Sequence, residues 1–138
     1  MQKIDVKVDW AGTNYCGHWT YLYMGVVIST AKTWEGFKKD FEEALDFHLE
    51  GCEKHGDALP QWAIDRDYEI EYYLETAALL RRAEEYTTLK AISRASGLKL
   101  SVLKKYASAE VYPRAEQREK IVAALKKIAK DLLLLSEG

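Results

Sequence analysis

Carboxylates on predicted strands are the first side chains in this sequence that could do chemistry. Asp5, Asp9 and Glu69 could in principle assemble at one sheet and hold two metal ions for hydrolysis. Their spacing, however, is that of the solvent-facing positions of alternating strands, and no nucleophile–base pair, phosphate-binding loop or metal-ligand spacing accompanies them. We therefore predict no catalytic residue, no metal site and no cofactor, and we expect a binding protein rather than an enzyme.

The cysteines and the N-terminus indicate the compartment. Cys16 and Cys52 have neither metal-like spacing nor a secretory context, so we expect free thiols. Residues 1–10 carry alternating charges instead of a signal-peptide core, and the longest apolar run, residues 21–28, is too short to span a bilayer. We expect a cytoplasmic protein with no membrane partner.

The charges divide the chain into two halves of opposite sign. Residues 1–75 hold 7 lysines and arginines against 15 aspartates and glutamates, a balance of −8, whereas residues 76–138 hold 13 against 7, a balance of +6. An acidic surface favours a basic protein partner, and a basic surface favours a polyanion. The net charge of −2 conceals both tendencies.

The first half reads as an α+β domain with the element order βββαβ. Residues 3–10 alternate strictly between apolar and charged positions, which predicts a strand with one buried face. An aromatic strand at 15–23 follows, and then a β-branched strand at 25–30, which we expect to be covered on both faces. Apolar residues recur at helical spacing from Trp34 to Cys52 behind an N-cap at Thr33.

A last strand at 68–74 closes the first half, and every later pattern is helical. We therefore place the domains at 1–74 and 75–138. The long final helix, 115–135, carries aliphatic residues in near-heptad spacing, which suits either packing within the domain or a dimer seam.

Two sets of side chains are candidates for partner binding in the first half. Alternate aromatic residues on the second strand suit either a sheet core or a recognition surface, and the outward face of the long helix is mostly acidic. The predicted partner-binding residues are Trp19, Tyr21, Tyr23, Glu42, Glu43 and Asp46.

Residues 88–106 read as a helix-turn-helix. Thr88 can cap a first short helix, Gly97 supplies the positive φ of a tight turn, and a second helix follows with lysines on its outward side. A plain helical hairpin with a solvated lysine face is the alternative. The predicted DNA-binding residues are Arg94, Lys99, Ser101, Lys104 and Lys105.

Several short sequence blocks, spread along nearly the whole chain, carry a resemblance to a known family, and they occur in the same order as in that family. They are IDVKVDW at 4–10, TAKTWEGFKKDFEEALDFH at 30–48, PQW at 60–62, DYE at 67–69, AISRASG at 91–97 and PRAEQREKI at 113–121. In these blocks the chain resembles the HicB family of antitoxins, in the variant that carries a C-terminal helix-turn-helix.

The resemblance implies a role and two partners. The first domain is expected to adopt a partial ribonuclease-H-like fold without ribonuclease activity and to neutralise a small basic mRNA-cleaving toxin of the HicA family. The second is expected to bind operator DNA and repress the operon, as a homodimer or higher oligomer. The alternative is a stand-alone helix-turn-helix transcriptional regulator whose first domain senses a ligand or another protein.

The second helix of the predicted helix-turn-helix, which would contact the DNA bases, departs at its start from the usual sequence of such helices. Lys99, Leu100 and Val102 occupy places where such helices commonly carry a Ser or Asn cap and polar readers. Aliphatic side chains can touch a thymine methyl but cannot make the paired hydrogen bonds that fix adenine or guanine. We therefore expect toxin binding to be the main activity.

Overall fold

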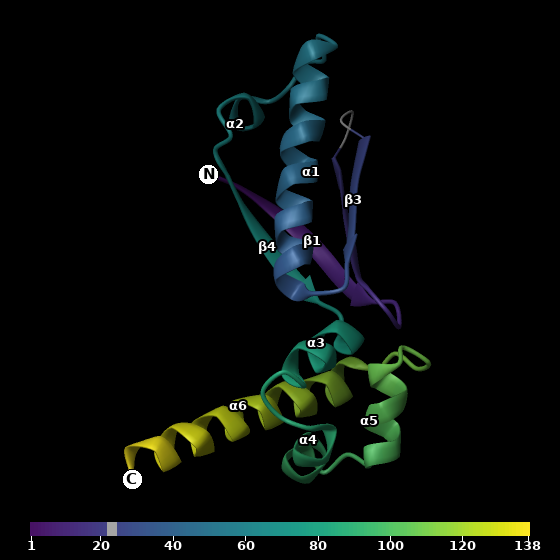
Figure 1. Cartoon of the computed structure of the whole chain (residues 1–138), viewed down its shortest axis with the longest axis vertical. Helices are drawn as coiled ribbons and strands as arrows, with labels where there is room; N and C mark the ends of the chain where they lie inside the picture. The colour runs from purple at the N-terminus through teal and green to yellow at the C-terminus, as the bar shows by residue number, and fades with distance from the viewer. Residues whose placement is uncertain (22–24) are drawn as a thin grey trace. The chain divides into compact units, whose positions relative to one another are not determined.

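A computed structural model describes residues 1–21 and 25–138, and the chain divides within it between Glu75 and Thr76 (Figure 1). Residues Met1–Glu75 form unit 1, and residues Thr76–Gly138 form unit 2. The division lies one residue from the predicted domain boundary and coincides with the reversal of charge along the chain.

Unit 1 contains a four-stranded mixed sheet in the order β3-β2-β1-β4. Its strands are β1 (Gln2–Trp10), β2 (Tyr15–Tyr21), β3 (Gly25–Ala31) and β4 (Tyr68–Leu74). The first three strands pair antiparallel, whereas β4 pairs parallel with β1, with Ile4 opposite Ile70. Because β3 and β4 run in the same direction at opposite edges, their connection has to cross the sheet.

Helix α1 (Trp34–Lys54) makes that crossing and covers one face of the sheet, as Figure 1 shows. Thr33 is its N-cap, as predicted, since its Oγ1 accepts a hydrogen bond from the backbone N of Gly36 at 3.1 Å. The apolar stripe of α1 is buried, and the helix contacts β3 and β2 of the sheet. The predicted order of three strands, a helix and a strand, followed by helices only, is confirmed.

Strand β3 is not covered on both faces, and that prediction was wrong. Val27 and Ser29 are buried on the face under α1, whereas Val26 and Ile28 on the other face are 49% and 67% exposed. β-Branched residues favour a strand whether one face or both are covered, so their run predicted the strand without revealing its surroundings.

A short helix that the sequence pattern did not predict, α2 (Gln61–Ile64), follows the loop after α1. It positions Trp62 edge-on to two aromatic rings of β2, with centroids 6.3 Å from Trp19 and 5.7 Å from Tyr21. This contact contributes to the burial of Trp19.

Tyr72 on β4 places a phenol inside the aromatic core of unit 1. Its ring packs edge-on against Trp34, Phe37 and Phe41, and its hydroxyl is buried without a hydrogen-bond partner among the described residues. Burial, and next the nearby charge of Glu42, raise the pKa of Tyr72 to about 12.

We expect Tyr72→Phe to stabilise unit 1 by about 1 kcal/mol, because it removes a buried polar group that has no partner. The stabilisation by Tyr72→Phe should be larger at alkaline pH than at neutral pH. Unfolded tyrosine ionises from about pH 10, whereas folded Tyr72 keeps its proton to about 12, so the wild type loses stability between these pH values. Urea unfolding at pH 7 and 10.5 measures both effects. Tyr73→Phe, at an exposed tyrosine of the same strand, is the control, and an equal response of both variants would contradict the assignment.

Unit 2, which the structure describes throughout, is built from four helices. They are α3 (Thr76–Ala83), α4 (Leu89–Ser96), α5 (Leu100–Ala107) and α6 (Ala115–Glu137). One buried cluster joins all four and contains Leu80, Ile92, Leu103, Tyr106, Ile121 and Ala124. Arg118 Nη1 also donates a hydrogen bond to Thr76 Oγ1 at 3.1 Å, which ties the start of α6 to the start of α3.

The turn between α4 and α5 follows the prediction. Thr88 Oγ1 accepts a hydrogen bond from Ala91 N at 3.0 Å, and Gly97 has a φ of 78°, so both predicted signals at the ends of α4 are confirmed. Ser93 Oγ donates to the carbonyl of Leu98 at 2.5 Å, which fixes the chain entering α5. Within the described part of the chain, none of these helices combines the length and the hydropathy needed to cross a membrane.

Candidate functional site

Helix α5 presents a basic, exposed side opposite its buried one. Leu103 and Tyr106 point into the core of unit 2, and the other side of the helix is in solvent. The exposed residues at this helix that were predicted to contact DNA are Lys99, Ser101, Lys104 and Lys105. We call these four residues the α5 face; three of them carry positive charge.

The N-terminus of α5 departs from ordinary capping. Lys99 is the N-cap residue and makes no side-chain capping hydrogen bond. Val102 packs against the core, and Leu100 is half-buried, which explains why aliphatic residues replace polar ones at these places. The α5 face therefore provides three positive charges and one hydroxyl, and none of its residues is an Asn or Gln whose amide could form paired hydrogen bonds with a base.

Arg94 does not belong to the α5 face. It lines a shallow groove between α4 and α6 whose other lining residues come from those two helices. They are Ala91, Ala95, Lys127, Ile128, Asp131 and Leu132. Arg94 was predicted to contact DNA because it lies within the helix-turn-helix pattern. That pattern shows that Arg94 is exposed on the first helix, but it does not show whether Arg94 lies near the exposed residues of α5.

Helix α1 presents an acidic, exposed surface outside its buried apolar stripe. Glu42, Glu43, Asp46 and Glu50 are exposed there, and the ring of Phe47 stands among them at 78% exposure. We call these five residues the α1 face. The sequence analysis did not predict Phe47 as a partner-binding residue. Its position outside the apolar stripe from Trp34 to Cys52 could have indicated that its ring is exposed.

Asp46 is partly engaged within unit 1. The guanidinium of Arg66 bonds Asp46 Oδ1 through Nε at 3.1 Å and Glu53 Oε1 through Nη1 at 3.0 Å. Arg66 itself has a φ of 55°, which is uncommon for a residue with a side chain. The bridges hold the turn after α2 against α1, so Asp46 has a structural role beside any partner contact.

The aromatic residues of β2 belong mainly to the core. Trp19 is only 9% exposed and stacks on the half-buried Tyr21, with centroids 5.6 Å apart. The ring of Trp19 therefore has little free surface to offer a partner, and its contact with a partner stays a prediction. Tyr23, also predicted to contact a partner, lies outside the described residues.

The carboxylates first considered for catalysis do not form a metal centre. Among the described residues no three His, Cys, Asp or Glu side chains are grouped closely enough to hold a metal ion. Asp5 and Glu69 are exposed on the side of the sheet away from α1. Neighbouring Glu71 instead pairs with Lys3, with Nζ and Oε1 3.0 Å apart.

Neither cysteine is placed as a nucleophile. Cys16 and Cys52 are both free of disulfide bonds, and burial, followed by a nearby aspartate in each case, raises the pKa of both thiols. A buried thiol of raised pKa holds little thiolate at neutral pH.

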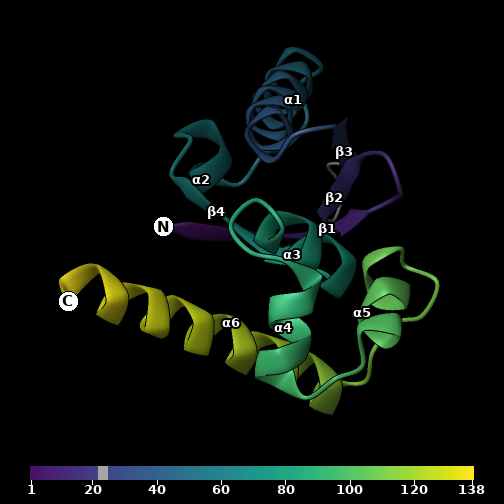
Figure 2. The same cartoon turned by 60° about the horizontal axis from the view of Figure 1, so that its bottom comes forward.

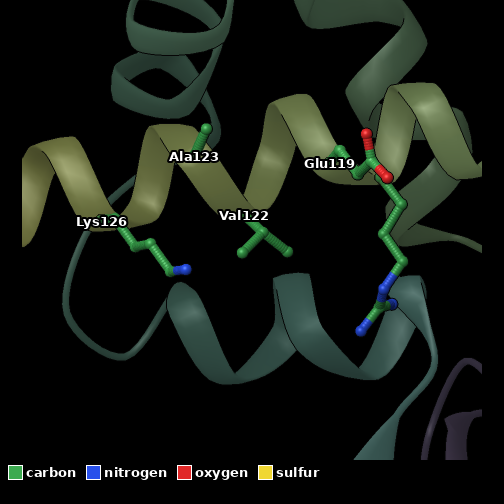
Figure 3. A pocket seen from close by; sticks show the side chains of 5 residues that line it. Glu119, Val122, Ala123 and Lys126 are labelled. Atoms are coloured by element: carbon green, nitrogen blue, oxygen red, sulfur yellow. The ribbon is translucent and has the colours of Figure 1, made fainter.

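A hollow on α6 is too open to be a small-molecule site (Figure 3). Its lining residues are Arg118, Glu119, Val122, Ala123 and Lys126, all from that one helix. Val122 and Lys126 project from one side of α6 and Ala123 from the other, so the polar groups do not converge on a common point. The two charged helix faces are therefore the better candidates.

Comparison with known proteins adds no relative: no family model, no curated protein and no solved structure matches the chain.

Proposed function

We propose that the protein is the antitoxin of a type II toxin–antitoxin pair of the HicB family. In this proposal unit 1 binds and neutralises a HicA-like mRNA-cleaving toxin, and unit 2 binds operator DNA to repress the operon. The observation that carries the proposal is the separation of an acidic α1 face and a basic α5 face on two units of opposite net charge.

Charge complementarity supports the toxin half. A toxin that binds mRNA needs a basic surface, and the α1 face offers carboxylates around one exposed aromatic ring. Aromatic anchors inside a polar rim are typical of the centre of a protein interface. The partial ribonuclease-H-like assignment of unit 1 is part of the proposal and is supported by its mixed sheet with one covering helix.

The helix-turn-helix assignment supports the DNA half. Helices α4 and α5 are joined by a short glycine turn, and the second of them carries the exposed lysines. In such motifs the second helix enters the major groove and neighbouring cations contact phosphates. We propose no catalytic activity for either unit.

Co-expression tests the proposal in cells. The gene should lie beside a short reading frame that encodes a basic protein, whose expression alone should stop growth and whose expression with this chain should not. A neighbour that is harmless alone, or still toxic in the presence of this chain, would contradict the antitoxin role. If the chain nevertheless binds its own upstream DNA, the stand-alone regulator is the better description.

For the DNA half, Lys104→Glu with Lys105→Glu should weaken binding to the DNA upstream of the gene. Each lost phosphate contact should lower the slope of log affinity against log salt by about one, so the double variant should lose about two. Fluorescence anisotropy at several salt concentrations measures the slope.

The matched control for that variant makes the same charge change in unit 1. Lys32→Glu with Lys39→Glu reverses two exposed lysines outside the α5 face. An equal loss in both double variants, or an unchanged slope for the first, would remove the α5 face from the DNA interface.

A further inference from the structure

Strand β3 forms one edge of the sheet in unit 1, and no described strand pairs with its outer side. Figures 1 and 2 show β3 at that edge, beside α1. Its residues pair one to one with Tyr15–Tyr21 of β2, without a bulge. Every second residue of such an edge strand directs its backbone N–H and C=O groups away from the neighbouring strand. The outer side of β3 therefore offers a row of backbone donors and acceptors that the described strands leave unpaired.

The residues of β3 carry none of the features that usually protect such an edge. Edge strands in soluble proteins are commonly protected by charged side chains, prolines or bulges. The sequence of β3, GVVISTA, contains neither a charge nor a proline, and Val26 and Ile28 are 49% and 67% exposed. The other edge strand, β4, exposes Glu69 and Glu71 instead. Of the two edges, that of β3 is the one suited to pair with a strand of another chain.

One side of α1 lies above this edge. The helix runs along β3, since the ring of His48 lies 3.4 Å from the position that a Cβ atom on Gly25 would occupy. Arg66, in the turn before β4, pairs with Asp46 and Glu53 and marks the side of α1 toward the far edge. The opposite side of the helix, at spacings of three and four residues, carries Asp40, Ala44, His48 and Gly51. A strand added to β3 would meet this side of α1, which offers an exposed carboxylate and two small residues.

A second copy of this chain fits the edge poorly. If β3 paired antiparallel with its own copy, the two α1 helices would lie side by side on one face of the joined sheet. Unit 1 holds 15 aspartates and glutamates against 7 lysines and arginines, so this arrangement would set like charges against each other. A basic partner would be attracted by the same charges.

We propose that the outer side of β3 binds an extended strand of the toxin, which continues the sheet of unit 1. Backbone hydrogen bonds along β3 supply affinity, and the alternating side chains of the added strand supply specificity. On the open face that strand should place apolar side chains beside Val26 and Ile28, and on the other face a basic side chain near Asp40. The identity of the partner rests on the proposed function, whereas the mode of binding rests on β3 itself.

Hydrogen exchange of the full chain, alone and with the purified toxin, tests the mode of binding. The amides of β3 that point outward should exchange at least ~10-fold more slowly in the complex, because they become hydrogen-bonded. The amides of β4, at the other edge of the sheet, are the internal control and should keep their rates.

A pair of lysine variants tests the same edge by affinity. Ile28→Lys should lower the affinity for the toxin about 10- to 100-fold, because it removes an apolar contact and adds a charge of the partner's own sign. Tyr73→Lys makes the same change of charge on β4 and should leave the affinity near that of the wild type. Both side chains are exposed, and circular dichroism checks that both variants fold. Titration calorimetry measures the affinities.

Two results would overturn the inference and leave the antitoxin role intact. They are toxin binding with unchanged exchange in β3, and an equal loss of affinity in both lysine variants. Protection of β3 that grows with the concentration of the chain alone would assign the edge to a second copy, and would overturn the inference too. A wild-type chain that does not bind the toxin contradicts the proposed function itself, and the inference fails with it.

Discussion

If the proposed antitoxin role holds, reversing two charges on the α1 face should abolish neutralisation of the toxin. Glu42→Lys with Glu43→Lys replaces attraction by repulsion toward a basic partner, and we expect the affinity for the toxin to fall on the order of 100-fold, or about 2.7 kcal/mol. Both side chains are exposed, so unit 1 should stay folded. Titration calorimetry with the toxin and growth rescue in cells measure the loss.

The control for this variant lies on the other side of the sheet. Asp5→Lys with Glu69→Lys makes the same change in charge at two exposed carboxylates away from α1. We expect this variant to keep near wild-type affinity. If it loses binding while the α1 variant does not, the toxin binds the open side of the sheet and the α1 face has no role.

The second large effect concerns the independence of the two units. Leu103 is fully buried in the core of unit 2, and Leu103→Ala should cost ~2–5 kcal/mol, from the lost apolar burial and the cavity that remains. A unit of this size has little stability to lose, so unit 2 should unfold and DNA binding should disappear. Toxin neutralisation should persist.

The tryptophans make this test selective. All four lie in unit 1, at Trp10, Trp19, Trp34 and Trp62. Denaturation followed by tryptophan fluorescence therefore reports unit 1, whereas far-ultraviolet circular dichroism reports helices of both units. Leu103→Ala should remove part of the dichroism transition at low denaturant and leave the fluorescence midpoint unchanged.

The reciprocal variant is Phe37→Ala, at a fully buried ring under the sheet. It should lower the fluorescence midpoint and abolish neutralisation while DNA binding survives. Coincident shifts of both signals in both variants would contradict two independently stable units.

Local signals in the sequence predicted most of the secondary structure. The alternation of Ile4, Val6 and Val8 predicted β1, because the pleat sends successive side chains to opposite faces. Thr33 and Thr88 predicted helix starts, because their hydroxyls satisfy backbone N–H groups that a helix leaves unpaired. These signals act over a few residues, so one sequence is enough to read them.

The packing of segments that lie far apart in the sequence could not be predicted from such local signals. Nothing in the sequence of β3 tells that it is an edge strand with Ile28 in solvent, because strand order depends on pairing with distant segments. The groove position of Arg94 depends on how α6 packs on α4, and the burial of Trp19 depends in part on Trp62, 43 residues later in the chain. The α5 face was predictable because helical spacing alone separates its lysines from Leu103 and Tyr106.

The most direct test of the proposed function is inhibition of RNA cleavage in vitro. The purified product of the neighbouring short reading frame is incubated with a labelled mRNA and increasing amounts of the full chain, without operator DNA. We predict that cleavage stops once the chain reaches a molar amount equal to that of the toxin, and that the Glu42→Lys, Glu43→Lys variant fails to stop it. Cleavage that continues in the presence of excess wild-type chain would contradict direct neutralisation.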